Sequence, residues 1–143
     1  MKFIEFINKY YHQDVDFDNR FGCQCVDLFR QYCHDVLSIP HTGVVDGARE
    51  LWFKFGENKE KDYFLRFSIV NAEYGDVIIW DKTDTNEFGH VAIFVAKVAD
   101  KVLVFEQNGF KQDGCHLSLR DKDNCLGILR PKNKVMECMK WDN

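Results

Sequence analysis

The stretch FGCQCVDLFRQYCHD, residues 21–35, sets two cysteines one residue apart at the point where an amphipathic helix is predicted to begin. The apolar residues of this helix fall at helical spacing and form one stripe: Cys25, Leu28, Phe29, Tyr32, Cys33, Val36 and Leu37. The Ile39-Pro40 step predicts its end, because the residue before a proline is disfavoured in the helical conformation. Cys25 and Asp27 are therefore expected in its first turn.

Two further helices are predicted on either side of this segment. Residues 3–11 carry Phe, Ile and Tyr at helical spacing, which indicates a short amphipathic helix. The stretch DGARELWFKF, residues 46–55, predicts another helix, with Asp46 as a possible N-cap. Its inward-facing residues are expected to be Ala48, Leu51, Trp52 and Phe55.

From about residue 63 the pattern changes to short β-branched and aromatic runs separated by Gly, Asn and Asp, which is typical of strands. The predicted strands are FSIV (67–70), DVIIW (76–80), HVAIFVAKV (90–98), KVLVFEQN (101–108), CHLSLR (115–120) and CLGILR (125–130). A tight hairpin at Ala99-Asp100 is expected to join two of them. Helices followed by an antiparallel sheet predict one α+β domain over residues 1–131, with residues 132–143 as an unassigned polar tail.

Composition excludes several classes of function. A chain of 143 residues with 45% hydrophobic residues can bury a single core without a metal or a disulfide. The net charge of -4 gives no electrostatic reason to expect nucleic acid or an anionic membrane as a partner. Residues 1–11 lack the features of a signal peptide, and no apolar run is long enough to span a bilayer. We therefore expect a soluble protein made in the cytoplasm, with its six cysteines reduced and no CxxC pair among them.

Cys25 is the best candidate for a nucleophile. The unpaired N–H groups and the partial positive charge at the start of a helix stabilise a thiolate in its first turn. Cys23 lies before the helix, where this stabilisation weakens. Taken alone, a cysteine on an apolar stripe is equally a small buried hydrophobic residue, so the choice depends on a nearby base.

That base is predicted to be His90, which follows Gly89 and begins a strand. The hairpin at Ala99-Asp100 places position 90 opposite roughly position 109, so Glu106 to Asn108 lie close to the imidazole. A carboxylate or an amide is then available to orient the ring. Cysteine, histidine and Glu or Asn at the ends of a helix and of strands are the arrangement of a thiol hydrolase.

The acidic segment DVDFDNRFG, residues 14–22, places Asp14, Asp16 and Asp18 at alternating positions. It is not an EF-hand, because its sixth position is Asn19 and its twelfth is Cys25. Together with Asp27 these carboxylates offer hard oxygen ligands for Ca²⁺, and an ordinary solvated acidic loop explains them equally well. A zinc site built on Cys23, Cys25 and two histidines is the weaker alternative, because the usual ligand spacing is missing.

Five segments taken together resemble the CHAP family, the cysteine- and histidine-dependent amidohydrolases and peptidases of phage endolysins, virion-associated lysins and bacterial wall hydrolases. They are GCQCVDLFRQY, YGDVIIWD, FGHVAIFV, VFEQNG and GILRPK, and they occur in the order of the family between about residues 3 and 131. The resemblance implies a papain-like α+β fold, with the N-terminal helices packed on an antiparallel sheet.

The resemblance also implies a role for each site residue. Cys25 would be the nucleophile, His90 the general base, Glu106 the residue that orients it, and Asn108 a further polar member of the site. In family members with a calcium loop, the acidic ligands would fall on Asp16, Asp18 and Asp27. The implied reaction is cleavage of an amide bond in peptidoglycan, either between muramic acid and L-alanine or within the stem peptide or cross-bridge.

Two alternatives stay open at this point. One is a phage structural or wall-binding protein that keeps the fold without the activity, and the other is a thiol enzyme that acts on another substrate. No wall-binding module follows the catalytic region in this sequence. The enzyme would then reach the wall through its own groove, through a separate wall-binding subunit, or as a component of a virion.

Overall fold

The computed structural model describes residues 1–17, 24–40, 43, 45–108 and 113–133. Its helices of one turn or more are α1 (Phe3–Tyr10), α2 (Cys25–Tyr32), α3 (Glu50–Phe53) and α4 (Glu60–Tyr63), and α2 continues as a π-helix, η1 (Cys33–Leu37). Two 3-10 turns, η2 (Phe55–Glu57) and η3 (Ile69–Asn71), follow α3 and β1. In the part of the chain that the structure describes, no helix is long and apolar enough to cross a membrane.

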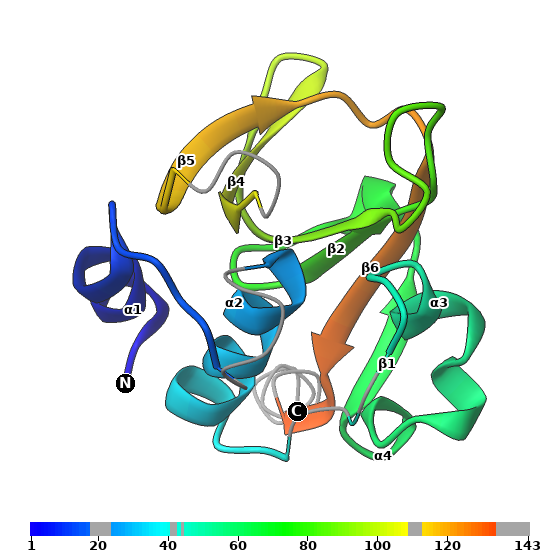
Figure 1. The fold of residues 1–143 in the computed structure, drawn as a ribbon, viewed down its shortest axis with the longest axis horizontal. Coiled ribbons are helices and arrows are strands. Elements are labelled where there is room, and N and C mark those ends of the chain that lie inside the picture. Colours follow the sequence, from blue (N-terminus) through cyan, green and yellow to red (C-terminus); the bar gives the residue numbers. More distant parts are fainter. Residues whose placement is uncertain (18–23, 41–42, 44, 109–112, 134–143) are drawn as a thin grey trace, which may run out of the picture.

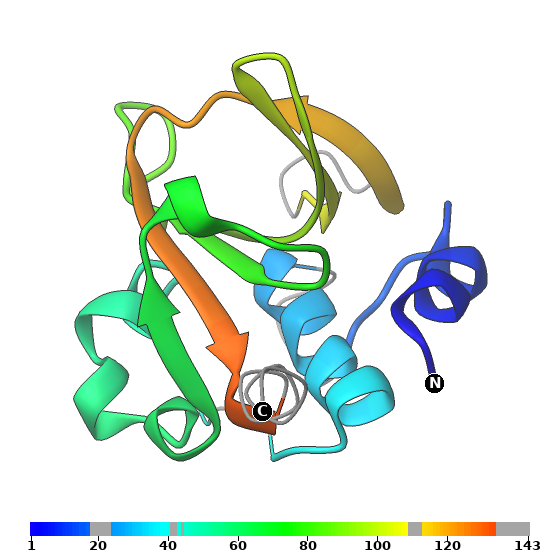
Figure 2. The ribbon, with the colours of Figure 1, turned by 180° about the vertical axis from the view of Figure 1, so that it is seen from behind.

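Six strands form one antiparallel sheet in the order β1-β6-β2-β3-β4-β5. They are β1 (Phe64–Phe67), β2 (Val77–Trp80), β3 (His90–Val98), β4 (Lys101–Gln107), β5 (Cys115–Arg120) and β6 (Cys125–Pro131). Figures 1 and 2 show α2 beside β3, with α1 at one end of the molecule and α3 and α4 at the other. The predicted α+β class is confirmed, and helices that cover an antiparallel sheet are the architecture that the family resemblance implied.

The sheet separates two apolar clusters, as the alternation of side chains along each strand requires. The larger cluster joins the helices to one face, and its fully buried members include Phe6, Leu28, Phe29, Val91, Ile93 and Phe105. The smaller cluster lies on the other face and contains Ile78, Trp80, Ala92, Phe94, Val102, Val104 and Ile128. Helix α2 is thereby held against β3, the strand that begins with His90.

The predicted start and end of the central helix are confirmed. Helix α2 begins at Cys25, so the first turn carries Cys25 and Asp27 as expected. After the π-helical turn, Ser38 adopts a left-handed conformation with a φ of 53°, and its N–H donates to the carbonyl of Cys33. The chain therefore leaves the helix two residues before Pro40.

Two predictions in the middle of the chain are wrong. The strand predicted at residues 67–70 instead ends at Phe67, because the Ser68 hydroxyl accepts a hydrogen bond from the N–H of Val70 and starts η3. Asp46 does not cap a helix, since α3 begins only at Glu50, and the N–H of Asp46 donates to the Glu50 carboxylate. The helix predicted over residues 46–55 is thus reduced to one turn, although Ala48 and Leu51 are buried as expected.

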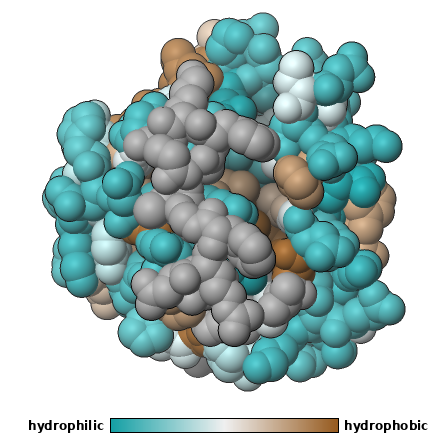
Figure 3. All heavy atoms as spheres, viewed as in Figure 1, coloured by the Kyte–Doolittle hydropathy of each residue, from teal (hydrophilic) through white to brown (hydrophobic). Residues whose placement is uncertain are grey.

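The described surface on the face drawn in Figure 3 is largely hydrophilic, and its hydrophobic side chains form separate spots. The predicted domain boundary falls at the end of β6, after which residues 132 and 133 begin a helical turn. Residues 134–143, most of the predicted polar tail, lie outside the described residues.

Gly127 in β6 is expected to tolerate no side chain. Its φ is 151°, and a Cβ atom there would lie 2.5 Å from the Trp52 ring and 2.8 Å from the carbonyl oxygen of Phe67. We predict that Gly127→Ala lowers the free energy of unfolding by about 1–3 kcal/mol, the usual cost of overpacking a close-packed site. Urea denaturation measures this. Gly56→Ala is the matched control, since a Cβ at Gly56 meets nothing within 4 Å, and equal losses in the two variants would contradict the prediction.

Candidate active site

The thiol of Cys25 stands at the first position of α2, next to a locally stabilised helix start. The N–H of Gln24 donates to a carboxylate oxygen of Asp27 at 3.1 Å, and the carbonyl of Gln24 accepts from the N–H of Asp27 at 3.0 Å. Asp27 is buried, and its carboxylate also lies 3.6 Å from the guanidinium of Arg30. Asp27 therefore serves the start of the helix that presents Cys25.

A turn with its own supports presents His90. The side-chain amide of Asn86 donates to the carbonyl of Gly89 at 2.9 Å. Gly89 has a φ of 75°, and a Cβ atom there would lie 2.5 Å from the carbonyl of Trp80. Arg49, the residue before α3, stabilises the same turn, because its N–H donates to the carbonyl of Phe88 and its side chain pairs with Asp81 at 2.7 Å. A glycine before the histidine is thus needed for backbone conformation and for close approach.

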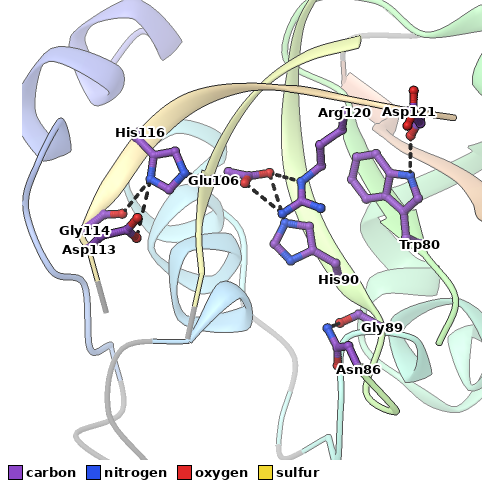
Figure 4. A network of polar contacts seen from close by, with 10 residues as sticks. All are labelled: Trp80, Asn86, Gly89, His90, Glu106, Asp113, Gly114, His116, Arg120 and Asp121. Carbon is purple, nitrogen blue, oxygen red and sulfur yellow. Dashed lines mark hydrogen bonds and ion pairs between the residues drawn. The ribbon is translucent and has the colours of Figure 1, made fainter. Parts of the chain in front are cut away.

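Glu106 lies at the centre of a network of charged side chains (Figure 4). One carboxylate oxygen is 3.2 Å from Nε2 of His90, and both oxygens accept hydrogen bonds from the guanidinium of Arg120, one of them at 2.9 Å. The second oxygen is 3.6 Å from Nε2 of His116. Only 3% of the Glu106 side chain is exposed, so its charge depends on the His90 and Arg120 side chains beside it.

The network and the thiol approach each other around the end of the sheet. His90 and Glu106 continue the rows of Ala92 and Val104, which face the smaller cluster, whereas α2 packs on the opposite face. His90 is the first residue of β3, so it stands at the end of the strand that packs against α2. Hydrogen bonding from His90 and from the backbone N–H of Val91 acts on the pKa of the Cys25 thiol, so both groups lie beside the sulfur.

These contacts change the protonation of all three groups. Burial alone raises the pKa of the Cys25 thiol, but the hydrogen bond and the charge of His90, with the Val91 N–H, bring it below its ordinary value. Burial opposes the charged imidazole, yet hydrogen bonds to Cys25 and Glu106 raise the pKa of His90 to about 9. Despite burial, His90 and Arg120 lower the pKa of Glu106 to about 2. All three shifts therefore favour the charged forms, a thiolate, an imidazolium and a carboxylate.

Two other described cysteines have a pKa that is shifted in the opposite direction. Burial raises the pKa of the Cys33 thiol, and burial raises the pKa of Cys125 to about 11. Cys25, Cys33, Cys115 and Cys125 are all free thiols. The feature that distinguishes Cys25 from Cys33 and Cys125 is the His90 ring that lowers its pKa.

The other residues predicted for the site are Asn108, the acidic residues and Cys23. Asn108 follows the last residue of β4 and is half-buried, and its role stays a prediction. Asp16 is half-buried, and its Oδ1 atom has no hydrogen-bond partner among the described residues. Asp18 and Cys23 lie outside the described residues. The part of the chain that the structure describes contains no group of three or more potential metal ligands.

Four neighbours of the site were not identified from the sequence: Trp80, Val91, His116 and Arg120. The Trp80 ring lies 5.7 Å from the His90 ring between centroids, and its indole N–H donates to the carbonyl of Asp121. The strand CHLSLR does hold a signal for the two charged neighbours. His116 and Arg120 alternate with apolar residues on one face of β5, but only the pairing of β5 with β4 shows that this face meets Glu106.

Comparison with known proteins identifies what this arrangement is similar to. The model of the family described as CHAP domain matches residues 14–108. A D-alanyl-L-alanine endopeptidase of Streptococcus phage B30 is 35% identical over 82 residues, which are 55% of this chain and 18% of that protein. Endolysin PlyTW of Staphylococcus phage Twort is 26% identical over 85 residues, 55% of this chain and 16% of the relative. The chain thus matches less than a fifth of the length of either relative.

A solved structure supports the fold independently. The crystal structure of Ly7917 superposes on 92% of this chain and 62% of its own with a TM-score of 0.66, at 17% sequence identity. At that identity the similarity concerns the fold alone. It agrees with the papain-like arrangement of helices and antiparallel sheet expected from the sequence.

Replacement of Glu106 by glutamine is predicted to lower the pKa of His90. The amide keeps the shape of the side chain but removes the negative charge that stabilises the imidazolium, while Arg120 still faces the ring. We expect the midpoint of the His90 titration, followed by NMR, to fall from about 9 by about one to three pH units. Asp121→Asn is the control, because the Asp121 side chain pairs with Lys101 at the same corner. An unchanged midpoint in Glu106→Gln would refute the assignment.

Proposed function

Because the chain belongs to the CHAP domain family, we propose that it hydrolyses an amide bond of bacterial peptidoglycan with Cys25 as the nucleophile. The observation that carries this proposal is the row of half-buried Cys25 and buried His90 and Glu106, in which the thiol has a lowered pKa and the imidazole a raised one. An imidazolium beside a thiolate supplies both the nucleophile and the proton that cleavage of an amide requires.

The reaction follows from these groups in two halves. The Cys25 thiolate attacks the carbonyl carbon and forms a carbon–sulfur bond, while the carbonyl oxygen becomes an oxyanion. The His90 imidazolium then donates its proton to the leaving nitrogen, the carbon–nitrogen bond breaks, and an acyl-enzyme remains. A water molecule transfers a proton to His90 and attacks the acyl carbon. The thiolate leaves, and the imidazolium is restored with it.

The oxyanion is expected to bind to backbone N–H groups in the first turn of α2, including that of Cys25. The first amides of a helix have no partner within it, although the N–H of Asp27 already donates to the Gln24 carbonyl. Each such donor often contributes about 3 kcal/mol to stabilisation of the transition state. Glu106 holds the imidazole ring and keeps it charged, and Arg120 in turn holds Glu106.

The candidate bonds are the amide between muramic acid and L-alanine and the peptide bonds of the stem peptide or cross-bridge. The name of the Streptococcus phage B30 relative, a D-alanyl-L-alanine endopeptidase, makes a peptide bond between D-alanine and L-alanine the first to test. Mass spectrometry of the fragments released from purified walls distinguishes them, because the newly exposed amine identifies the bond that was broken.

Cys25→Ala is predicted to abolish wall hydrolysis. The variant keeps the helix but lacks the sulfur, so we expect the loss of turbidity of purified cell walls to slow by at least about a thousandfold. Cys125→Ser, which changes a cysteine whose pKa is raised by burial to about 11, is the control and should clear walls like the parent protein. Equal clearing by Cys25→Ala and the parent protein would exclude the proposed chemistry and favour a wall-binding role or another substrate.

Calcium binding by the acidic segment is a separate proposal. Asp16 fits a cation because its buried Oδ1 has no hydrogen-bond partner among the described residues, and carboxylate oxygens are the ligands that Ca²⁺ prefers. We propose that Asp16 and Asp18 hold the ion. Asp27, the third ligand implied by the resemblance, is engaged with Gln24 and Arg30 at the start of α2. A bound cation would neutralise negative charge beside the segment that leads to Cys25.

Ca²⁺ is accordingly predicted to raise the melting temperature over that measured in EGTA. A ligand that binds only the native state stabilises it by about 2.7 kcal/mol at a concentration one hundred times its Kd. Asp16→Asn should reduce this gain, whereas Asp84→Asn in the loop before β3 should leave it unchanged. The same melting temperature in EGTA and in excess Ca²⁺ would rule out a site of useful affinity.

A further inference from the structure

Gln107, the last residue of β4, is fully buried, and its side-chain amide uses all of its hydrogen-bonding capacity. The amide oxygen accepts from the N–H of Val15 at 2.7 Å and from the thiol of Cys115 at 3.5 Å. The amide nitrogen donates to the carbonyl of Val15 at 2.7 Å and to the carbonyl of Gln24 at 2.9 Å. The partners determine which end of the amide is oxygen, because an N–H must donate and a carbonyl must accept.

These bonds connect the sheet to two distant segments. Val15 and Gln24 are separated from Gln107 by 92 and 83 residues in the sequence, and neither belongs to a strand. Without the amide, the N–H and carbonyl of Val15 would lose their partner in a buried place. A buried backbone group left without a hydrogen bond is costly, so the segment would move to find another partner.

The bond to Gln24 acts directly on the start of α2. The carbonyl of Gln24 also accepts the hydrogen bond from the N–H of Asp27 that begins the helix. The residue after Gln24 is Cys25. Gln107 therefore holds the backbone immediately before the sulfur. Its neighbour in the sequence, Glu106, holds the imidazole on the other face of the sheet, because consecutive strand residues point to opposite faces.

We propose that Gln107 is a positioning residue for catalysis, which fixes the position of the first turn of α2 relative to the end of β4. Glu106 fixes the position of His90 relative to the same strand end. Two adjacent residues therefore determine where the thiol and the imidazole stand relative to each other. This inference rests on the proposed function, because it assigns Gln107 a role in the reactivity of Cys25. Gln107 itself contacts no reacting atom.

The opposite end of the same helix supplies a matched control. The hydroxyl of Tyr32, the last residue of α2, donates to the carbonyl of Gly75 at 2.7 Å, and this bond is also buried. Tyr32→Phe removes one buried hydrogen bond between α2 and the sheet region without touching the first turn. Both variants should lose stability, and only the change at Gln107 should affect the reactivity of Cys25.

The experiment compares Gln107→Met and Tyr32→Phe with the parent protein on solubilised peptidoglycan fragments. Methionine matches glutamine in length and removes every hydrogen bond of the amide. We expect kcat of Gln107→Met to fall about 10- to 100-fold, the range found when a reacting group is slightly misplaced. KM should change less than about twofold, because no substrate contact is lost. Alkylation of Cys25 by iodoacetamide at neutral pH, measured by peptide mass spectrometry, should slow in parallel.

A second variant tests the same hydrogen bonds in case Gln107→Met fails to fold. Gln107→Glu keeps the volume and the oxygen that faces the Val15 N–H, but it lacks the two donors to the carbonyls of Val15 and Gln24. It should show the same fall in kcat and in alkylation rate. A folded Gln107 variant whose kcat and alkylation rate equal those of Tyr32→Phe would overturn the inference alone. A parent protein in which Cys25 labels no faster than Cys33 would overturn the proposed function and this inference with it.

Discussion

The packing of helix α2 against strand β3 is the constraint on which the chemistry of this protein depends. Apolar residues of the helix and of the sheet, such as Phe29, Val91 and Phe105, share one core, and that core leaves the first residue of the helix beside the first residue of the strand. The thiol of Cys25 and the imidazole of His90 are thus neighbours although 65 positions separate them in the numbering. A change in the register of the helix on the sheet would separate them whatever their individual chemistry.

The charges at the site alternate, and this alternation explains why they are stable out of water. The thiol of Cys25, the imidazole of His90, the carboxylate of Glu106 and the guanidinium of Arg120 follow one another, and the pKa shifts of the first three favour their charged forms. Each buried charge therefore has an opposite charge beside it, which offsets the desolvation that would otherwise neutralise it. Arg120 has two opposing effects, since it keeps Glu106 ionised and oriented while its own charge lowers the pKa of His90. The net effect lowers the pKa of Cys25, whereas burial raises the pKa of Cys33 and of Cys125.

Much of the fold and the core of the site were predictable because their signals are local. The helical spacing of the apolar residues from Cys25 onward predicts the observed start of α2. β-branched runs predict five of the six strands at nearly their observed bounds. The misplaced first strand and the short α3 show where local signals compete. A serine hydroxyl turns the chain after Phe67, and the N–H of Arg49 donates to the carbonyl of Phe88, far away in the sequence, just before α3 begins.

By itself, then, the sequence determined the elements and the chemical types at their ends, including Cys25, His90 and Glu106, because periodicity and residue type act over short distances. Only the tertiary structure decided how these ends meet. An irregularity between Phe94 and Ala96 sets Ile93 opposite Phe105, one position away from the register that the hairpin alone predicts. The contacts of Arg120 depend on the pairing of β5 with β4, and those of Gln107 on segments more than 80 residues away, so no local pattern carries this information.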